Sequence, residues 1–184
     1  MDKKGAMELS VSTIVIVVLS MIMLIVGSVI VKKVACTTIN GIDKLDENMK
    51  ESIIETFKDT NQKITFKEYQ NKVPKGVEYG IGFGIKNLLG SKKEFSYKIN
   101  VRDVGSCNFK KEDAEKWITL GKEDSFSIAG GEIYTSKFML LIPENVENCK
   151  LRYTMTVYTN DKEIYDSSNV DVEIINKPLF ASFC

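Results

Sequence analysis

The chain has 184 residues, in which 25 lysine and arginine residues balance 25 aspartate and glutamate residues. A formal charge of zero with only two arginines excludes the clustered basic excess of a nucleic-acid-binding domain, so we expect no nucleic-acid partner. Histidine is absent, which excludes Ser-His-Asp and Cys-His catalytic sites and imidazole metal sites. We therefore expect a protein that is not an enzyme and that uses no cofactor and no metal.

The first ten residues, MDKKGAMELS, form a short charged leader. Lys3, Lys4 and Gly5 stand directly before Ala6, and Glu8 follows two residues later. This arrangement resembles the class III signal peptide of archaeal type IV pilins and archaellins, which a prepilin-type peptidase cuts beside a Lys/Arg-Gly junction. The resemblance implies cleavage after Gly5 or after Ala6, and assembly of the retained apolar helices into a filament.

In that family a glutamate pairs with the positively charged N-terminus of a neighbouring subunit. The resemblance implies the same subunit contact for Glu8. The family glutamate stands at the fifth mature position, whereas Glu8 would be third after Gly5. This departure leaves a second interpretation open, in which residues 1–10 are the leader of an ordinary uncleaved signal anchor.

The stretch Val11–Val31 contains 21 residues without a charge, a proline or an aromatic side chain. As a helix it would span roughly 31 Å, which is about the hydrocarbon thickness of a bilayer. Lys32 and Lys33 follow it directly, where a cleavable secretory signal would carry small residues. We therefore predict a retained transmembrane helix over residues 11–33, with the lipid bilayer as its partner.

All four cysteines, Cys36, Cys107, Cys149 and Cys184, come after this apolar stretch, and none forms a Cys-x-x-Cys pair. Widely spaced cysteines in even number suit an oxidising exterior. We favour a Cys107–Cys149 disulfide and a second bridge between Cys36 and Cys184, with reduced buried thiols as the alternative. Two lysines stand on each side of the apolar stretch, so the positive-inside rule does not orient it. The cysteines, which favour an oxidising exterior, therefore decide the topology. We predict a single-pass protein of the cell membrane with a cytoplasmic N-terminus and an extracellular C-terminal domain.

Residues 34–62 predict an amphipathic juxtamembrane helix. Apolar side chains recur there at steps of three or four, and charged side chains occupy the opposite face. Gly41 interrupts the pattern, so the membrane helix either continues through it or breaks near residues 37–41 and restarts with Asp43 as its cap. The apolar stripe consists of Ile42, Leu45, Met49, Ile53 and Phe57.

Beyond residue 63 the apolar period changes to two, which predicts strands with one buried face. Turn signals separate these runs, among them residues 159–161 and 166–169. Residues 111–116 are expected to form one helical turn, and Trp117 to fill the core. We predict an antiparallel Ig-like β-sandwich over residues 63–184. The alternating apolar positions begin at Val77, Phe95, Phe126, Phe138, Leu151 and Val170.

The region 73–176 resembles the CARDB-type Ig-like domains of archaeal and bacterial surface proteins. Gly130, Pro143 and Tyr153 occupy the positions of a glycine turn, a strand-ending proline and a tyrosine-bearing strand. The loop of such domains carries a glycine before the tyrosine strand, whereas this chain has Asn148 and Cys149. The resemblance implies a binding or structural module outside the cell, and it brings no catalytic residue.

Gly80, Gly82 and Gly84 alternate with apolar residues in a predicted strand. Glycines on one face of a strand permit close approach, so we expect either the amphipathic helix or another subunit to pack there. The spacing does not match a dinucleotide-binding loop. The acidic pairs at 112–113 and 123–124 are expected to be solvated rather than to bind calcium.

Together these patterns predict a mainly β protein with a long N-terminal helix, in which one transmembrane helix precedes an antiparallel Ig-like sandwich. The predicted function is that of a pilin-like surface subunit, acting in filament assembly or adhesion through self-assembly or other surface proteins. The alternative is a monomeric tethered module that binds a partner protein or a surface glycan.

Overall fold

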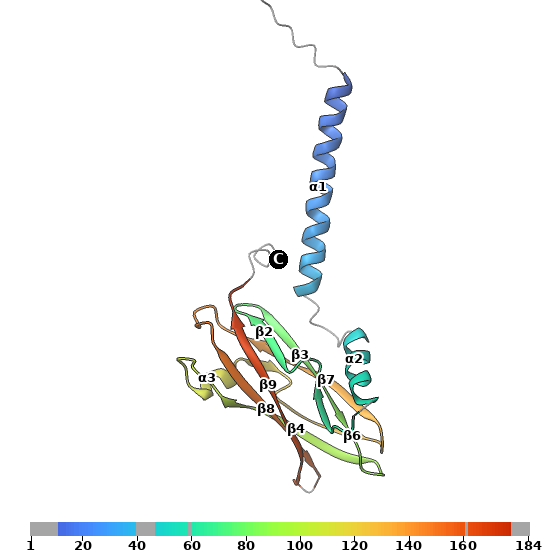
Figure 1. Cartoon of the computed structure of the whole chain (residues 1–184), viewed down its shortest axis with the longest axis vertical. Helices are drawn as coiled ribbons and strands as arrows, with labels where there is room; N and C mark the ends of the chain where they lie inside the picture. The colour runs from blue at the N-terminus through green and yellow to red at the C-terminus, as the bar shows by residue number, and fades with distance from the viewer. Residues whose placement is uncertain (1–10, 40–46, 59, 161, 178–184) are drawn as a thin grey trace, which may run out of the picture. The chain divides into compact units, whose positions relative to one another are not determined.

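A computed structural model describes residues 11–39, 47–58, 60–160 and 162–177, with the side chains of residues 11–12 and 31–39 left aside. The chain divides into two units, one containing the N-terminal helix α1 and the other spanning residues 41–179. Both units are drawn in Figure 1.

Helix α1 (Val11–Ile39) contains the whole predicted apolar stretch and continues eight residues beyond it. Its segment Thr13–Ile30 is long and apolar enough to cross a membrane. Ser20 and Ser28 donate hydrogen bonds to the carbonyl oxygens of Ile16 and Ile25, so these hydroxyls are satisfied within the helix. A helix of this length and composition suits a membrane anchor or a signal sequence.

The second unit is a two-layer β-sandwich, as the sequence predicted. One sheet has four strands in the order β1-β3-β7-β5, and the other has five strands in the order β2-β9-β8-β4-β6. The strands are β1 (Ile64–Phe66), β2 (Gln70–Pro74), β3 (Glu78–Lys86), β4 (Lys93–Asp103), β5 (Ile118–Leu120), β6 (Glu123–Ile128), β7 (Ile133–Leu141), β8 (Lys150–Thr159) and β9 (Ile164–Ile175).

The core lies between the two sheets and is built from the alternating apolar positions. Ile81 and Phe83 of β3 face the interior with at most 1% of their surface exposed, while Gly82 between them faces outward. Such burial stabilises the fold by about 2 kcal/mol for each large side chain. The largest fully buried side chains include Phe66, Phe83, Phe95, Phe138, Leu140, Ile142 and Tyr153.

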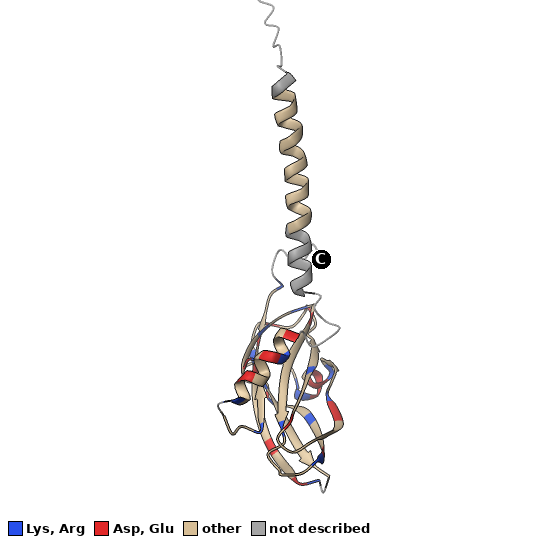
Figure 2. Ribbon diagram, turned by 90° about the vertical axis from the view of Figure 1, so that its right-hand side faces the viewer, with Lys and Arg blue, Asp and Glu red and all other residues tan. Residues whose placement is uncertain are grey.

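Helix α2 (Glu47–Lys58) covers the outer face of the four-stranded sheet. Ile53 and Phe57, two members of the predicted apolar stripe, are buried there. Ile42, Leu45 and the candidate cap Asp43 lie outside the described residues. Acidic residues mark the ribbon of α2 in Figure 2, whereas the described part of α1 carries no charged residue between 13 and 30.

The amphipathic helix therefore fills the place above the glycine stripe. A Cβ atom added at Gly82 would lie 2.5 Å from the Met49 sulfur, and one added at Gly84 would lie 2.6 Å from Cγ2 of Ile53. Of the two packing partners expected from the sequence, the structure contains the helix of the same chain.

Two features of the sheet differ from the expectation. The expected turn at residues 166–169 is wrong, because these residues lie inside β9 and pair with β8. The side chains of Ser167 and Asn169 face outward, and Thr154 of β8 bonds the Asn169 side chain at 2.6 Å. In addition, β2 pairs with β9 in parallel, whereas the other ladders are antiparallel as predicted.

Helix α3 (Lys111–Lys116) has the bounds of the predicted helical turn. Trp117 ends it, lies in the core, and packs edge-to-face on Phe109 with ring centroids 4.6 Å apart. The hydroxyl of Tyr153 on β8 donates a hydrogen bond to the Ala114 carbonyl oxygen at 3.1 Å. Burial, together with the charge of Glu115, raises the pKa of Tyr153.

Candidate functional site

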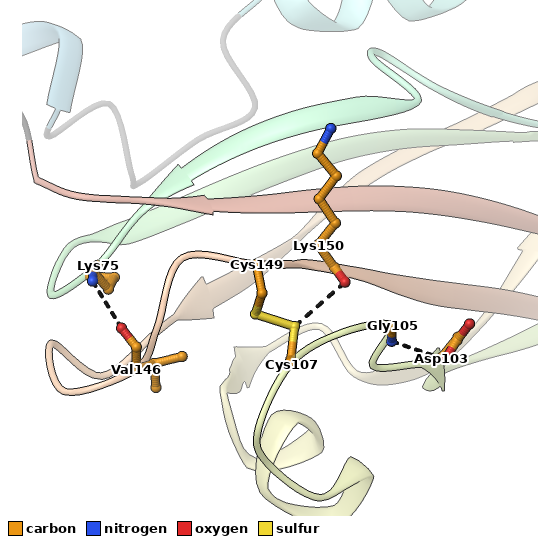
Figure 3. The surroundings of a disulfide bond; sticks show 7 residues. All are labelled: Lys75, Asp103, Gly105, Cys107, Val146, Cys149 and Lys150. Carbon is orange, nitrogen blue, oxygen red and sulfur yellow. Dashed lines mark hydrogen bonds between the residues drawn. A yellow bond between two sulfur atoms is a disulfide. The ribbon is translucent and has the colours of Figure 1, made fainter.

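The cysteines of the sandwich form one of the two predicted bridges. Cys107 and Cys149 are joined by a disulfide across Cα atoms 5.4 Å apart, which links the segment after β4 to the start of β8 (Figure 3). Cys184 lies outside the described residues, and the side chain of Cys36 is not described, so their bridge stays a prediction. The predicted processing residues Lys3, Lys4, Gly5 and Ala6, and the predicted contact Glu8, also lie outside the described residues.

The disulfide fixes the loop that follows β4 against β8. The sulfur of Cys107 lies 3.4 Å from the Lys150 carbonyl oxygen, a close contact because a bonded sulfur carries no proton to donate. Gly105 has a φ of +55°, and a Cβ atom there would lie 2.6 Å from the same carbonyl oxygen. Its amide donates to the Asp103 carboxylate at 2.9 Å. A glycine is therefore required where this loop approaches β8.

Beside this loop lies a groove of about 580 Å³ on the outer face of the five-stranded sheet. It extends from the end of β4 across β8 and β9 to the edge strand β2. In Figure 3 the Lys150 side chain points away from the disulfide, on the side of β9. The charged members of the lining are Glu68, Lys72, Asp103, Lys150, Arg152, Asp171 and Glu173.

Ion pairs between neighbouring strands neutralise most of these charges. Arg152 of β8 donates two hydrogen bonds to Asp171 of β9, at 2.5 and 2.9 Å. These bonds lower the pKa of Asp171, and they raise the pKa of Arg152. The Lys150 ammonium lies 3.7 Å from a carboxylate oxygen of Glu173. The groove thus presents fixed donors and acceptors rather than one strong charge.

Tyr79 of β3, a strand of the four-stranded sheet that contacts β2, lines the β2 end of the groove. It is partly buried, and burial raises the pKa of its hydroxyl, with a further contribution from the Glu68 carboxylate. Both residues line the groove. This end therefore combines an aromatic ring, a phenol and a carboxylate in one place.

The outer faces of the two sheets differ in what covers them. Helix α2 occupies that of the four-stranded sheet, whereas neither α2 nor α3 contributes a residue to the lining of the groove on the five-stranded sheet. Hydroxyl, amide and charged side chains fill this second face, including Thr154, Thr156 and Asn169. Within the described part of the chain, no cluster of three or more cysteine, aspartate or glutamate side chains is arranged to hold a metal ion.

Comparison with known proteins finds no matching family and no matching characterised sequence. Among solved structures, the chain is similar to a family 123 glycoside hydrolase from Clostridium perfringens, with 12% identity, a TM-score of 0.44, and 70% of this chain aligned to 25% of that one. It is also similar to the GspB Siglec domain, with 11% identity, a TM-score of 0.42, and coverages of 65% and 60%. The chain thus spans about a quarter of the first of these structures.

The groove was not among the predicted sites. Its residues lie between positions 68 and 173 and come from the five strands β2, β3, β4, β8 and β9 and from two loops, and only the pairing and stacking of those strands brings them together. One signal was present in the sequence, namely the alternation of opposite charges with apolar residues in 149–153 and 170–174. Such alternation indicates that the outer face is charged, but it does not indicate that this face contains a groove.

Proposed function

We propose that this protein is a cell-surface subunit anchored by α1, with a cytoplasmic N-terminus and an extracellular sandwich that acts by assembly or adhesion. The observation that carries the proposal is the exposed apolar surface of α1. Side chains such as Leu24 and Met23 are 74% and 78% exposed, and no polar face interrupts them. In water this surface would be costly, whereas lipid or other apolar helices would bury it.

The outward orientation rests on the disulfide. A bridge between Cys107 and Cys149 persists outside the cell, because cytosolic thiols are kept reduced. The pilin-like form of the proposal rests on the leader sequence around Lys3, Lys4 and Gly5 and on its resemblance to class III signal peptides. In that form a prepilin-type peptidase removes the leader, and the apolar helices pack together in a filament.

A second candidate function is that of a monomeric tethered module. The groove on the five-stranded sheet favours it, because neither α2 nor α3 lines this groove and a partner protein or a glycan could enter it without displacing α2. The two candidates share the anchor and the orientation, and they differ in the fate of the leader and in whether subunits assemble.

Membrane fractionation tests the shared part. We expect the protein to stay with the membrane after carbonate extraction, and intact cells to expose the sandwich to added protease. Ile22→Lys places a charge in the middle of the apolar segment, at a cost of about 3 kcal/mol for insertion, and should reduce the membrane fraction. Thr56→Lys on the exposed face of α2 is the matched control. A soluble wild-type protein, or a sandwich protected from protease, would contradict the proposal.

Electron microscopy of the cell surface separates the two candidates. If the protein is a filament subunit, filaments should be lost when it is deleted and should return with the wild-type gene. They should not return with a Gly5→Asp variant whose leader resists cleavage. Surface protein without filaments would favour the tethered module.

A further inference from the structure

The groove beside the disulfide presents alternating hydrogen-bond donors and acceptors. Cationic donors stand at Lys72, Lys150 and Arg152, and carboxylate acceptors at Glu68 and Asp103 flank them. Neighbouring strands of a sheet lie about 4.8 Å apart, so these groups recur at short, regular intervals across the strands. A ligand that carries many groups able both to donate and to accept would match this surface.

The charge balance limits the class of ligand. The lining holds three cationic and four acidic side chains, and the two cations on β8 are paired with carboxylates on β9. The Arg152 and Asp171 side chains are nevertheless 49% and 36% exposed, so both can still bond a ligand. A polyanion would be repelled by the carboxylates that are not in ion pairs. A polycation would have to compete with Lys150 and Arg152 for the carboxylates of Glu173 and Asp171. The arrangement suits a neutral ligand.

The edge of β2 offers little to an added peptide strand. The backbone groups of Tyr69 and Lys75 form hydrogen bonds with β9. In a parallel ladder, every second residue directs its backbone N–H and C=O groups toward the same neighbouring strand. Of residues 70–74, only Gln70, Lys72 and Pro74 therefore direct these groups toward the free edge. Pro74 has no N–H group to donate. Two residues with complete backbone edges are fewer than strand addition uses, which argues against an extended peptide as the occupant.

The Tyr79 end supplies what an oligosaccharide needs besides hydrogen bonds. A sugar ring has an apolar face of C–H groups and a rim of hydroxyls. The partly buried ring of Tyr79 can contact the first, and the carboxylate of Glu68 can accept from the second. Ligand sites commonly combine such an apolar surface with a few fixed polar groups.

From this arrangement we infer that the groove between β2, β9, β8 and the disulfide-bound loop binds a neutral oligosaccharide. In this site Arg152 and Lys150 donate to sugar hydroxyls, and Asp103 and Glu68 accept from them. The sugar ring at the β2 end lies against Tyr79. This site belongs to the sandwich alone, so it does not depend on whether the leader is cleaved or whether subunits assemble.

The test uses the full chain in a detergent without a sugar head group. A panel of neutral gluco-, manno-, galacto- and chito-oligosaccharides is compared with heparin fragments and a library of extended peptides. We expect at least one neutral oligosaccharide to bind. Its dissociation constant should rise about tenfold in the Arg152→Gln/Asp171→Asn variant, which loses two charged partners.

The matched control is Lys98→Gln/Glu123→Gln, which removes a second cross-strand ion pair, at 3.5 Å, outside the groove. It should bind like the wild type. If the first double variant does not fold, Glu68→Gln changes one exposed acceptor and should weaken the same ligand. The inference is overturned if no neutral oligosaccharide binds at millimolar concentration, if only heparin or peptides bind, or if groove and control variants bind equally.

Discussion

Gly84 of β3 lies so close to Phe57 of α2 that a Cβ atom added to the glycine would come within 2.7 Å of Cε2 in the phenylalanine ring. The close fit explains how a short helix with two fully buried apolar side chains is held on the sheet. The helix and the bare strand are complementary parts of one contact, and a change in either should loosen it.

Replacing Gly84 with alanine should lower the free energy of unfolding by about 2 kcal/mol, because the methyl group must displace Phe57 or Ile53. Chemical denaturation of the purified protein measures this. Gly90→Ala is the control, since a Cβ atom there meets nothing within 4 Å. Equal stabilities of the two variants would show that α2 does not rest on the glycine stripe.

The Cys107–Cys149 bridge encloses a segment with a sequence separation of 42. Restricting the unfolded chain over such a loop is worth about 4 kcal/mol, so the Cys107→Ala/Cys149→Ala variant should unfold at markedly lower denaturant concentration. Reductant should lower the denaturant midpoint of the wild type to a similar extent, and it should not change the midpoint of the variant. A wild-type midpoint insensitive to reductant would contradict the role assigned to this bridge.

Asn87 is buried and joins two loops at one end of the sandwich. Its amide donates to the carbonyl oxygens of Ser91 and Ile128, both at 2.9 Å, and its oxygen accepts from the amide of Leu89. Asn87→Ala leaves these groups without their partner and should cost about 3 kcal/mol in thermal or chemical unfolding. Asn108→Ala, at an exposed position, should change little. If Asn87→Ala does not lower the free energy of unfolding, the two loops are held by other contacts.

Alkaline pH should destabilise the sandwich through its buried tyrosines. Burial raises the pKa of Tyr97 and of Tyr153, so the unfolded chain ionises first, near pH 10. Their contribution to stability is complete below that pH and is lost as the pH rises toward the folded-state values. Unfolding free energies measured from pH 8 to 11 should fall above about pH 10.

Tyr153→Phe separates the hydroxyl from the ring. It should cost about 1 kcal/mol at neutral pH, through the lost bond to Ala114, and reduce the alkaline decline. Tyr158→Phe, on the outer face, is the control for loss of a hydroxyl. An unchanged alkaline slope in the Tyr153 variant would contradict the assignment.

The long alternating strands could be predicted because each buries one face. Ile81, Phe83 and Ile85 show the period of two directly, and the glycines between them predict the close packing that α2 makes there. The short strands β1 and β5 have three residues each, too few to show a period. The polar residues 166–169 near the start of β9 predict a turn because aspartate, serine and asparagine are turn formers.

The groove lay beyond sequence analysis for a different reason. Arg152 and Asp171 meet because β8 and β9 pair in one register, and a shift by one residue would place them on opposite faces. The parallel addition of β2, which brings Lys72 and the preceding Glu68 to the same surface, is a property of the chain's path between sheets. The pattern of charges along the sequence does not predict how the chain passes between the two sheets.

The most direct test of the pilin-like account is the intact mass of the protein purified from its native membrane, with and without reductant. The account predicts the loss of residues 1–5 or 1–6, and a gain of two hydrogens on reduction for each bridge, both for Cys107–Cys149 and for the predicted Cys36–Cys184. A protein that retains Met1 through Gly5 would contradict processing and leave the tethered module. A mass that reductant does not change would contradict the outward orientation.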